Sequence, residues 1–315
     1  MRVVLLAGGV GGAKMADGLA ATVGEDLTII VNTGDDLELH GLAIWPDHDT
    51  VAYTLAGLDD EIRGWGLRGE SWTVMDRLEA LGEVEWFRLG DRDLATHVWR
   101  TDRLRAGYRP TEVAVELATV MGIKPRILPM ADEPVRTEVR TDEGWLEFQE
   151  YFVHRHQEPI VHEVRFRGVE GARATPEVLA TIAAAEIIVI APSNPIVSID
   201  PILAVAGVRA AADEARERGV PIVAVSGIIG GKALKGPADK MLGSLGETST
   251  AAGVASRYAG LITHFVMDEI DVKLRPEVDA LGVETLVTDT IMTDDAARTR
   301  LASEVLRFAR PVTVS

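Results

Sequence analysis

Short apolar runs recur along this chain of 315 residues, and each run ends at glycine, proline or polar residues. Such runs are typical of strands that are buried on both faces of a parallel sheet. Helical patterns separate most of them, as in a series of βαβ units. The runs cover residues 3–7, 27–31, 187–191, 221–225, 264–267 and 283–287. The sequence therefore predicts an α/β fold with a doubly wound, mostly parallel, Rossmann-like sheet.

Two segments interrupt this alternation within what we expect to be a single α/β domain spanning residues 1–315. Residues 60–125 are predicted to form a helix-rich insertion, with a short strand at 86–89. Residues 137–169 alternate apolar and polar side chains around the turn at 142–144, which is typical of a β-hairpin. We expect this β-rich excursion to act as a lid or as an oligomer contact.

Charge and composition exclude several classes of protein. The formal net charge is −17, which disfavours non-specific binding to nucleic acid or to an anionic membrane. The chain has no cysteine, so disulfides, thiolate catalysis and cysteine-ligated zinc are excluded. No apolar run approaches the roughly 20 residues of a membrane span, and no signal peptide precedes the first strand. We expect a cytoplasmic protein that binds neither nucleic acid nor membrane.

A glycine-rich turn, Gly-Gly-Val-Gly-Gly-Ala-Lys, occupies residues 8–14 directly after the first apolar run. It lacks the Ser or Thr that follows lysine in a Walker loop, and Lys14 takes the last place of the dinucleotide fingerprint. One interpretation is simply a tight strand-to-helix turn. In the other, the N–H groups of Gly9, Gly11 and Gly12 bind a diphosphate, with positive charge added by Lys14.

Aspartates gather just after the second apolar run and again a few residues later. Asp35 and Asp36 form one pair, and Asp47 and Asp49 form another. A single pair is more often a turn, but two pairs beside a phosphate-binding turn favour a divalent cation. In an extended segment, Asp47 and Asp49 would point to opposite faces, so only one would meet a given ligand. We favour Asp49, because it lies nearer the expected start of the next helix.

Three further loops carry candidate binding residues. Arg92 stands between two aspartates, which indicates either a capped helix start or a cation held rigid to bind an anion or a ring. Ser193 and Asn194 lie between two prolines, a rigid arrangement suited to a base or ribose but also common in turns. Lys235 belongs to the lysine- and glycine-rich segment 230–240, which is either a phosphate contact or a surface loop.

Taken together, these motifs resemble the 2-phospho-L-lactate transferase family of coenzyme F420 biosynthesis, which includes phosphoenolpyruvate-type transferases. The matching pieces follow one another in order over nearly the whole chain. They are Gly-Gly-Val-Gly-Gly-Ala-Lys (8–14), Asn-Thr-Gly-Asp-Asp (32–36), Pro-Asp-His-Asp-Thr (46–50), Arg-Gly-Trp-Gly (63–66), Leu-Gly-Asp-Arg-Asp-Leu-Ala-Thr-His (89–97), Leu-Pro-Met-Ala-Asp (128–132), Phe-Gln-Glu (148–150), Ala-Pro-Ser-Asn-Pro-Ile-Val-Ser-Ile (191–199) and Lys-Gly-Pro-Ala (235–238).

The resemblance implies a specific phosphoryl-group transfer. A 2-phospholactyl or enolpyruvyl-phosphoryl group would pass from a guanosine diphosphate-linked donor to the ribityl hydroxyl of the deazaflavin Fo. The products would be a form of coenzyme F420-0 and GMP. The resemblance also implies Mg²⁺ as cofactor and a homodimer. The sequence does not indicate whether the acid is lactyl or enolpyruvyl.

The motifs assign roles to residues of this chain. Asp35 and Asp49 would be catalytic and would hold Mg²⁺, with Asp36 as an alternative ligand. By resemblance, Asp49 and Arg92 would contact Fo. The residues expected to bind the nucleotide and its phosphates are Gly9, Gly11, Gly12, Lys14, Ser193, Asn194 and Lys235.

The main alternative is a related family with the same fold that acts as a nucleotide-sugar-binding regulator of carbon metabolism. The motifs at 32–36 and 89–97 favour the transferase over this regulator. A nicotinamide dehydrogenase is disfavoured by Lys14 at the last fingerprint position.

Overall fold

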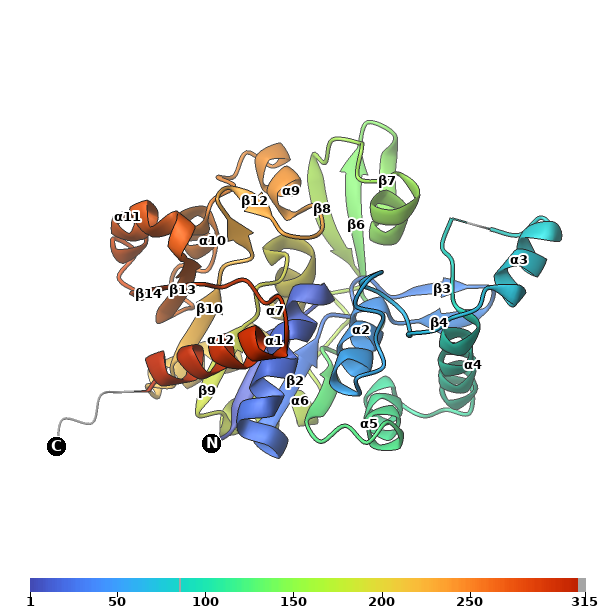
Figure 1. Cartoon of the computed structure of the whole chain (residues 1–315), viewed down its shortest axis with the longest axis horizontal. Helices are drawn as coiled ribbons and strands as arrows, with labels where there is room; N and C mark the ends of the chain where they lie inside the picture. The colour runs from blue at the N-terminus through green and yellow to red at the C-terminus, as the bar shows by residue number, and fades with distance from the viewer. Residues whose placement is uncertain (85, 311–315) are drawn as a thin grey trace.

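The computed structural model describes residues 1–84 and 86–310. Its centre is a seven-stranded sheet in the order β14-β13-β10-β9-β1-β2-β5, and every neighbouring pair is parallel (Figure 1). The strands are β1 (Val3–Ala7), β2 (Leu27–Val31), β5 (Arg126–Pro129), β9 (Ile187–Ile190), β10 (Ile222–Val225), β13 (His264–Asp268) and β14 (Glu284–Thr288). The predicted doubly wound α/β fold is confirmed, and the six apolar runs predicted as strands of this sheet all form strands. The sequence patterns missed β5, which has only four residues and ends in proline.

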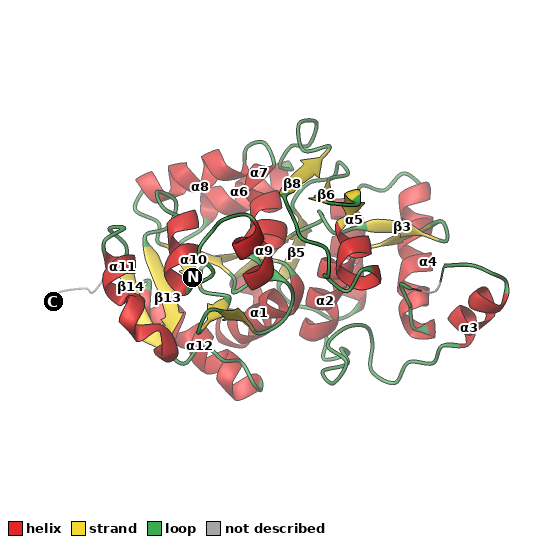
Figure 2. Ribbon diagram, turned by 90° about the horizontal axis from the view of Figure 1, so that it is seen from above, coloured by secondary structure: helices red, strands yellow, loops and turns green. Residues whose placement is uncertain are grey.

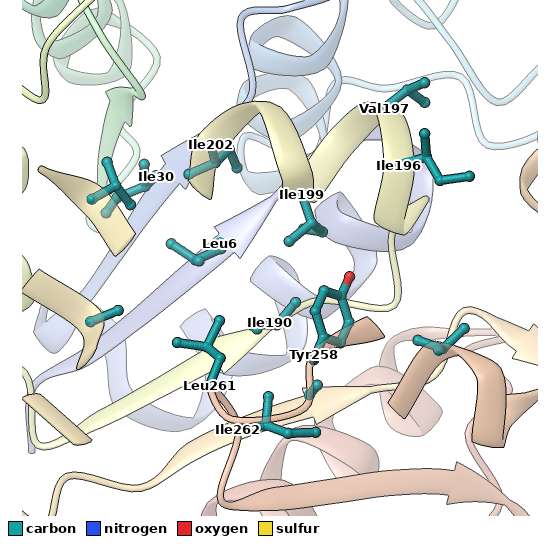
Figure 3. Close-up of a cluster of buried hydrophobic side chains, with 14 of the residues drawn as sticks. Leu6, Ile30, Ile190, Ile196, Val197, Ile199, Ile202, Tyr258, Leu261 and Ile262 are labelled. Atoms are coloured by element: carbon teal, nitrogen blue, oxygen red, sulfur yellow. The ribbon is translucent and has the colours of Figure 1, made fainter. Parts of the chain in front are cut away.

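Helices cover both faces of this sheet because the side chains of each strand alternate between the faces. Leu5 of β1 packs in the core beneath α1 (Gly9–Val23), α2 (Pro46–Leu55) and α12 (Asp295–Phe308). Leu6 packs in the core on the other face, with Ile30 and Ile190 beside it (Figure 3). The helices over that face include α6 (Pro176–Ala184), α8 (Val208–Glu217) and α10 (Ala251–Arg257).

The strand order reverses between β1 and β9, which places the topological switch point there. In such sheets, ligands bind in the crevice beyond the carboxyl ends of the strands flanking this point. The loops at that position are the glycine-rich turn after β1 and the segment 192–194 after β9. A Cβ atom at position 11 would lie 2.2 Å from the carbonyl oxygen of Pro192, so glycine at position 11 lets the two loops touch.

Residues 60–125, predicted as a helix-rich insertion, contain α3 (Thr73–Ala80), α4 (Asp91–Arg105) and α5 (Pro110–Val120), and the hairpin of β3 (Leu37–Leu39) and β4 (Leu42–Ile44) precedes them. α3 and α4 project at one end of the molecule, opposite to α11 (Arg275–Asp279) (Figure 2). The predicted strand at 86–89 is wrong, because these residues form no strand. Leu89 instead buries its side chain in a small core with Leu37 and Met75, so its apolar character serves packing without strand pairing.

The β-rich excursion is an antiparallel sheet in the order β7-β6-β8. It is built from β6 (Arg136–Thr141), β7 (Gly144–Glu147) and β8 (Glu163–Arg167), with the predicted hairpin turn between the first two. Its role as a lid or an oligomer contact stays a prediction. The remaining α-helices and strands are α7 (Asp200–Ala204), β11 (Ile228–Ile229), β12 (Lys232–Ala233) and α9 (Ala238–Ser244). Among the described residues, no helix is both long and apolar enough to cross a membrane.

Candidate functional site

Asp47 links the glycine-rich turn to Asn32, which directly follows β2. Its Oδ1 accepts a hydrogen bond of 2.8 Å from the Gly9 N–H, and its Oδ2 accepts one of 2.8 Å from Asn32 Nδ2. Burial raises the pKa of Asp47 to about 6, although both hydrogen bonds act in the opposite direction. The sequence favoured Asp49 over Asp47, because an extended segment would point the two side chains to opposite faces. Instead, α2 begins at Pro46, a residue favoured at the first helical position, and carries both aspartates in its first turn.

Asp35 and Asp36 are both buried in the turn after β2. Burial raises the pKa of each carboxyl well above its usual range, and the nearby Asp47 raises both further. For Asp36, Arg136 and Arg100 partly oppose the effect. One oxygen of each carboxyl, Oδ1 in both cases, has no hydrogen-bond partner among the described residues. Buried carboxylates left in this state need either protons or a cation.

Asp49 lies in a different electrostatic setting from these three carboxyls. It is ion-paired with Arg100, which is wholly buried and stacks 4.4 Å above the ring of Trp45. The Nδ1 atom of His48 lies 3.3 Å from Asp49 Oδ1. Burial alone would raise the pKa of Asp49, but Arg100 and His48 outweigh it and hold the pKa below its usual range. Asp49 is therefore ionised at neutral pH, and its Oδ2 has no hydrogen-bond partner among the described residues.

Asp93 and His97 of α4 complete a group with Asp49 that sequence analysis did not assemble. Each of the three residues offers one ligand atom, and these atoms lie within 4.8 Å of one another. The Tyr53 hydroxyl donates a hydrogen bond of 2.6 Å to Asp93 Oδ1, and His97 Nε2 lies 3.3 Å from the same oxygen. The spacing of four residues between Asp93 and His97 was visible in the sequence, but it is equally typical of an ordinary helical ion pair. This group contains Asp49 but not Asp35, so a shared metal site of Asp35 and Asp49 stays a prediction.

Arg92 is exposed at the start of α4. Its guanidinium donates to the carbonyl of Arg68 at 2.9 Å, and its backbone N–H donates to Glu70 at 2.8 Å. These contacts hold Arg92 against segment 68–70 and do not join it to the buried carboxylates. Its predicted contact with Fo stays a prediction.

The two loops at the switch point support each other. Ser193 Oγ donates to the Gly8 carbonyl at 2.7 Å and accepts a hydrogen bond of 3.3 Å from the Gly8 N–H. Asn194 Oδ1 accepts from the Ile196 N–H at 3.0 Å and so caps the short helical segment that follows. A Cβ atom at position 12 would lie 3.0 Å from Ser193 Oγ. These contacts give Ser193, Asn194 and the glycines structural roles, while their roles in nucleotide binding stay predictions.

Lys14 and Lys235 line one cavity of about 230 Å³ beside α1 and α2. Lys14 Nζ donates to the Met292 carbonyl at 2.8 Å. The structure therefore brings together two lysines that are 221 positions apart in the sequence and that were predicted separately as phosphate ligands.

Comparisons with known proteins agree with the resemblance. The sequence model of the family described as "2-phospho-L-lactate transferase CofD" matches residues 3–301. A phosphoenolpyruvate transferase of Streptomyces griseus is 42% identical over 319 residues, which cover 99% of each chain. A 2-phospho-L-lactate transferase of Methanosarcina mazei is 38% identical over 306 residues, which cover 97% of this chain and 99% of the relative.

A crystal structure of a UPF0052 family member from Bacillus halodurans matches with a TM-score of 0.66. It is 14% identical and covers 97% of this chain and 98% of that one, so it supports the fold alone. The relatives named as transferases favour the enzyme over the nucleotide-sugar-binding regulator. The chain belongs to the CofD family of 2-phospho-L-lactate transferases and is a transferase of this type.

Proposed function

We propose that the protein transfers a 2-phospholactyl or enolpyruvyl-phosphoryl group from a guanosine diphosphate-linked donor to the ribityl hydroxyl of Fo. The reaction would give a form of coenzyme F420-0 and GMP, would require Mg²⁺ and would be carried out by a homodimer. The names of the relatives support the transferred group. The switch-point crevice, with its glycine-rich turn, supports a diphosphate-containing donor.

The proposed dependence on a cation rests on one observation: the site contains more buried carboxylates than its own positively charged side chains neutralise. Unpartnered, buried oxygens remain on Asp35, Asp36 and Asp49. Mg²⁺ prefers oxygen ligands, so these donors fit it, whereas the group of Asp49, Asp93 and His97 includes an imidazole that suits other divalent metals. We propose Asp35 and Asp49 as Mg²⁺ ligands, with Asp36 as the alternative. The ion would neutralise charge on the transferred phosphoryl group.

The carboxylates would also accept the proton of the attacking hydroxyl. A general base works best when its pKa is near the operating pH. Without a bound cation, the pKa of Asp35 lies well above its usual range because of burial and Asp47, whereas that of Asp49 lies below. We propose that Asp35 or Asp49 accepts this proton, and that Asp49 and Arg92 contact Fo.

The test is a transfer assay with purified protein, Fo, Mg²⁺ and each of the two guanosine-linked donors. Mass spectrometry would detect the phosphodiester and GMP. Formation of both products with one donor would establish the activity and identify the acid, and omission of Mg²⁺ with added chelator should abolish it. No product from either donor with folded protein would overturn the proposal and favour a regulatory, nucleotide-sugar-binding role.

A further inference from the structure

The cavity beside α1 and α2 is small and has mixed walls. Its volume is about 230 Å³. This is below the range of about 300–1,000 Å³ usual for pockets that hold drug-sized ligands. Apolar side chains, threonine hydroxyls and three cations line it. They include Val10, Ile62 and Trp65, then Thr50, Thr54 and Thr293, and finally Lys14, Lys235 and Arg298; the carboxylates of Asp59 and Glu61 also line it.

The three cations of the cavity are not equally neutralised. Arg298 is ion-paired with Asp17 at 3.2 Å, with Glu61 at 2.8 Å and with Asp295 at 3.1 Å. Within the described residues, neither Lys14 nor Lys235 has a carboxylate oxygen within 4.0 Å. The pKa of Lys14 is lowered by burial and then by the charges of Arg298 and Lys235, and the carboxylates of Glu61 and Asp59 oppose this effect without cancelling it. An anion in the cavity would offset this repulsion.

The cavity lies between the two parts of the site already described. Val10 and Lys14 belong to α1, whose first turn is the glycine-rich segment. Tyr53 of α2 forms another part of the wall, and its hydroxyl donates to Asp93 of the carboxylate group. A phosphoryl group bound at the glycine-rich turn would therefore have this cavity beside it.

We propose that the cavity between Lys14 and Lys235 binds the carboxylate of the three-carbon acid of the donor, apart from the guanosine diphosphate portion. This inference rests on the proposed function. The acid has one carboxylate for the two lysines and a short carbon unit for the side chains of Val10, Ile62 and Trp65. The guanosine would lie elsewhere in the switch-point crevice.

Equilibrium binding to four proteins tests the assignment. Calorimetry would measure the affinities of the intact donor and of GDP for the wild type, Lys14→Gln, Lys235→Gln and Lys232→Gln. Lys232 is a matched control, because it lies in the same loop, is 80% exposed and pairs with Asp239 at 3.3 Å. We expect Lys14→Gln and Lys235→Gln to weaken donor binding about 10- to 100-fold, the usual effect of losing a charge-assisted hydrogen bond. GDP binding should not change, and Lys232→Gln should leave both affinities unchanged.

Two results would overturn the assignment. If donor and GDP affinities fell together, the lysines would bind the diphosphate; if neither fell, the cavity would not bind the donor. Parallel transfer assays on the wild type separate this outcome from a failure of the proposed function. Suppose that the wild type binds the donor more tightly than GDP, that the lysine variants lose this difference, and that the wild type still transfers nothing to Fo. That result would keep the cavity assignment and reject Fo as the acceptor.

Discussion

At the scale of single residues, Arg100 holds the key carboxylate in place. Its guanidinium is buried, pairs with Asp49, donates to the Ala43 carbonyl at 3.1 Å and stacks on Trp45. It also lies 3.1 Å from His97 Nδ1. A buried charge loses its hydration, so Asp49 stays ionised only while Arg100 compensates it. Arg100 is therefore a positioning residue that acts through Asp49.

Replacing Arg100 by methionine should separate this role from simple packing. We expect Arg100→Met to lower the free energy of unfolding by about 3–5 kcal/mol, because the charge of Asp49 would remain buried alone. The double variant Arg100→Met with Asp49→Asn should recover part of this loss, since neither charge then remains. Urea unfolding measures both. As a control, Arg2→Met removes a surface arginine that is 64% exposed and should change stability by less than about 1 kcal/mol. If Arg100→Met and Arg2→Met lowered the free energy of unfolding equally, the stabilising role of the buried pair would be contradicted.

At the scale of elements, the loops after β1 and β9 form the floor of the switch-point crevice. The carbonyl of Pro192 faces the backbone of Gly11, and Ser193 is hydrogen-bonded to Gly8. Because each loop limits the position of the other, a change in either should reach any ligand that lies above both.

Gly11→Ala tests this coupling. The added Cβ would lie 2.2 Å from a backbone oxygen, so one of the loops must move. We expect the free energy of unfolding to fall by about 1–3 kcal/mol, the usual cost of overpacking, and GDP affinity to fall with it. Gly243→Ala is the matched control: Gly243 lies in α9, and its Cβ would meet no atom within 4 Å. This control should be neutral or slightly stabilising, because alanine favours helix. Unchanged GDP affinity in Gly11→Ala would mean that the nucleotide does not contact these loops.

The elements also show which features a sequence can predict. Strands such as β9 were predictable, because a run of buried β-branched residues favours one structure locally. The hairpin of β3 and β4 was not predictable, because its three-residue strands depend on packing against α3 and α4. In the site, Asp35 and Asp49 drew attention as carboxylates near strand ends. The contribution of Arg100 was hidden, because α4 brings it to Asp49 across 51 positions of sequence.

At the scale of the whole molecule, the carboxylate site should reduce stability when no cation is bound. In the folded chain the pKa of Asp47 is about 6, compared with 3.8 for a free aspartate, and burial also raises the pKa values of Asp35 and Asp36. The folded protein therefore binds more protons than the unfolded chain between about pH 4 and pH 6. The contribution of Asp47 to stability is fully present below about pH 4 and is lost as the pH rises through 6. It is of the order of 3 kcal/mol.

This linkage determines how Tm should respond to pH and Mg²⁺. Without divalent cations, we expect the part of Tm that depends on Asp47 to fall between about pH 4 and pH 6, and Asp47→Asn to flatten the profile there. Calorimetric scans at several pH values measure both. Added Mg²⁺ should raise Tm at pH 7.5, because an ion that binds only the folded state stabilises it. The gain should shrink at pH 5, where protons compete for the same carboxyl oxygens. An equal gain at both pH values would place the bound ion away from Asp35, Asp36 and Asp47, since a site without raised pKa values would not lose its ligands to protons in this range.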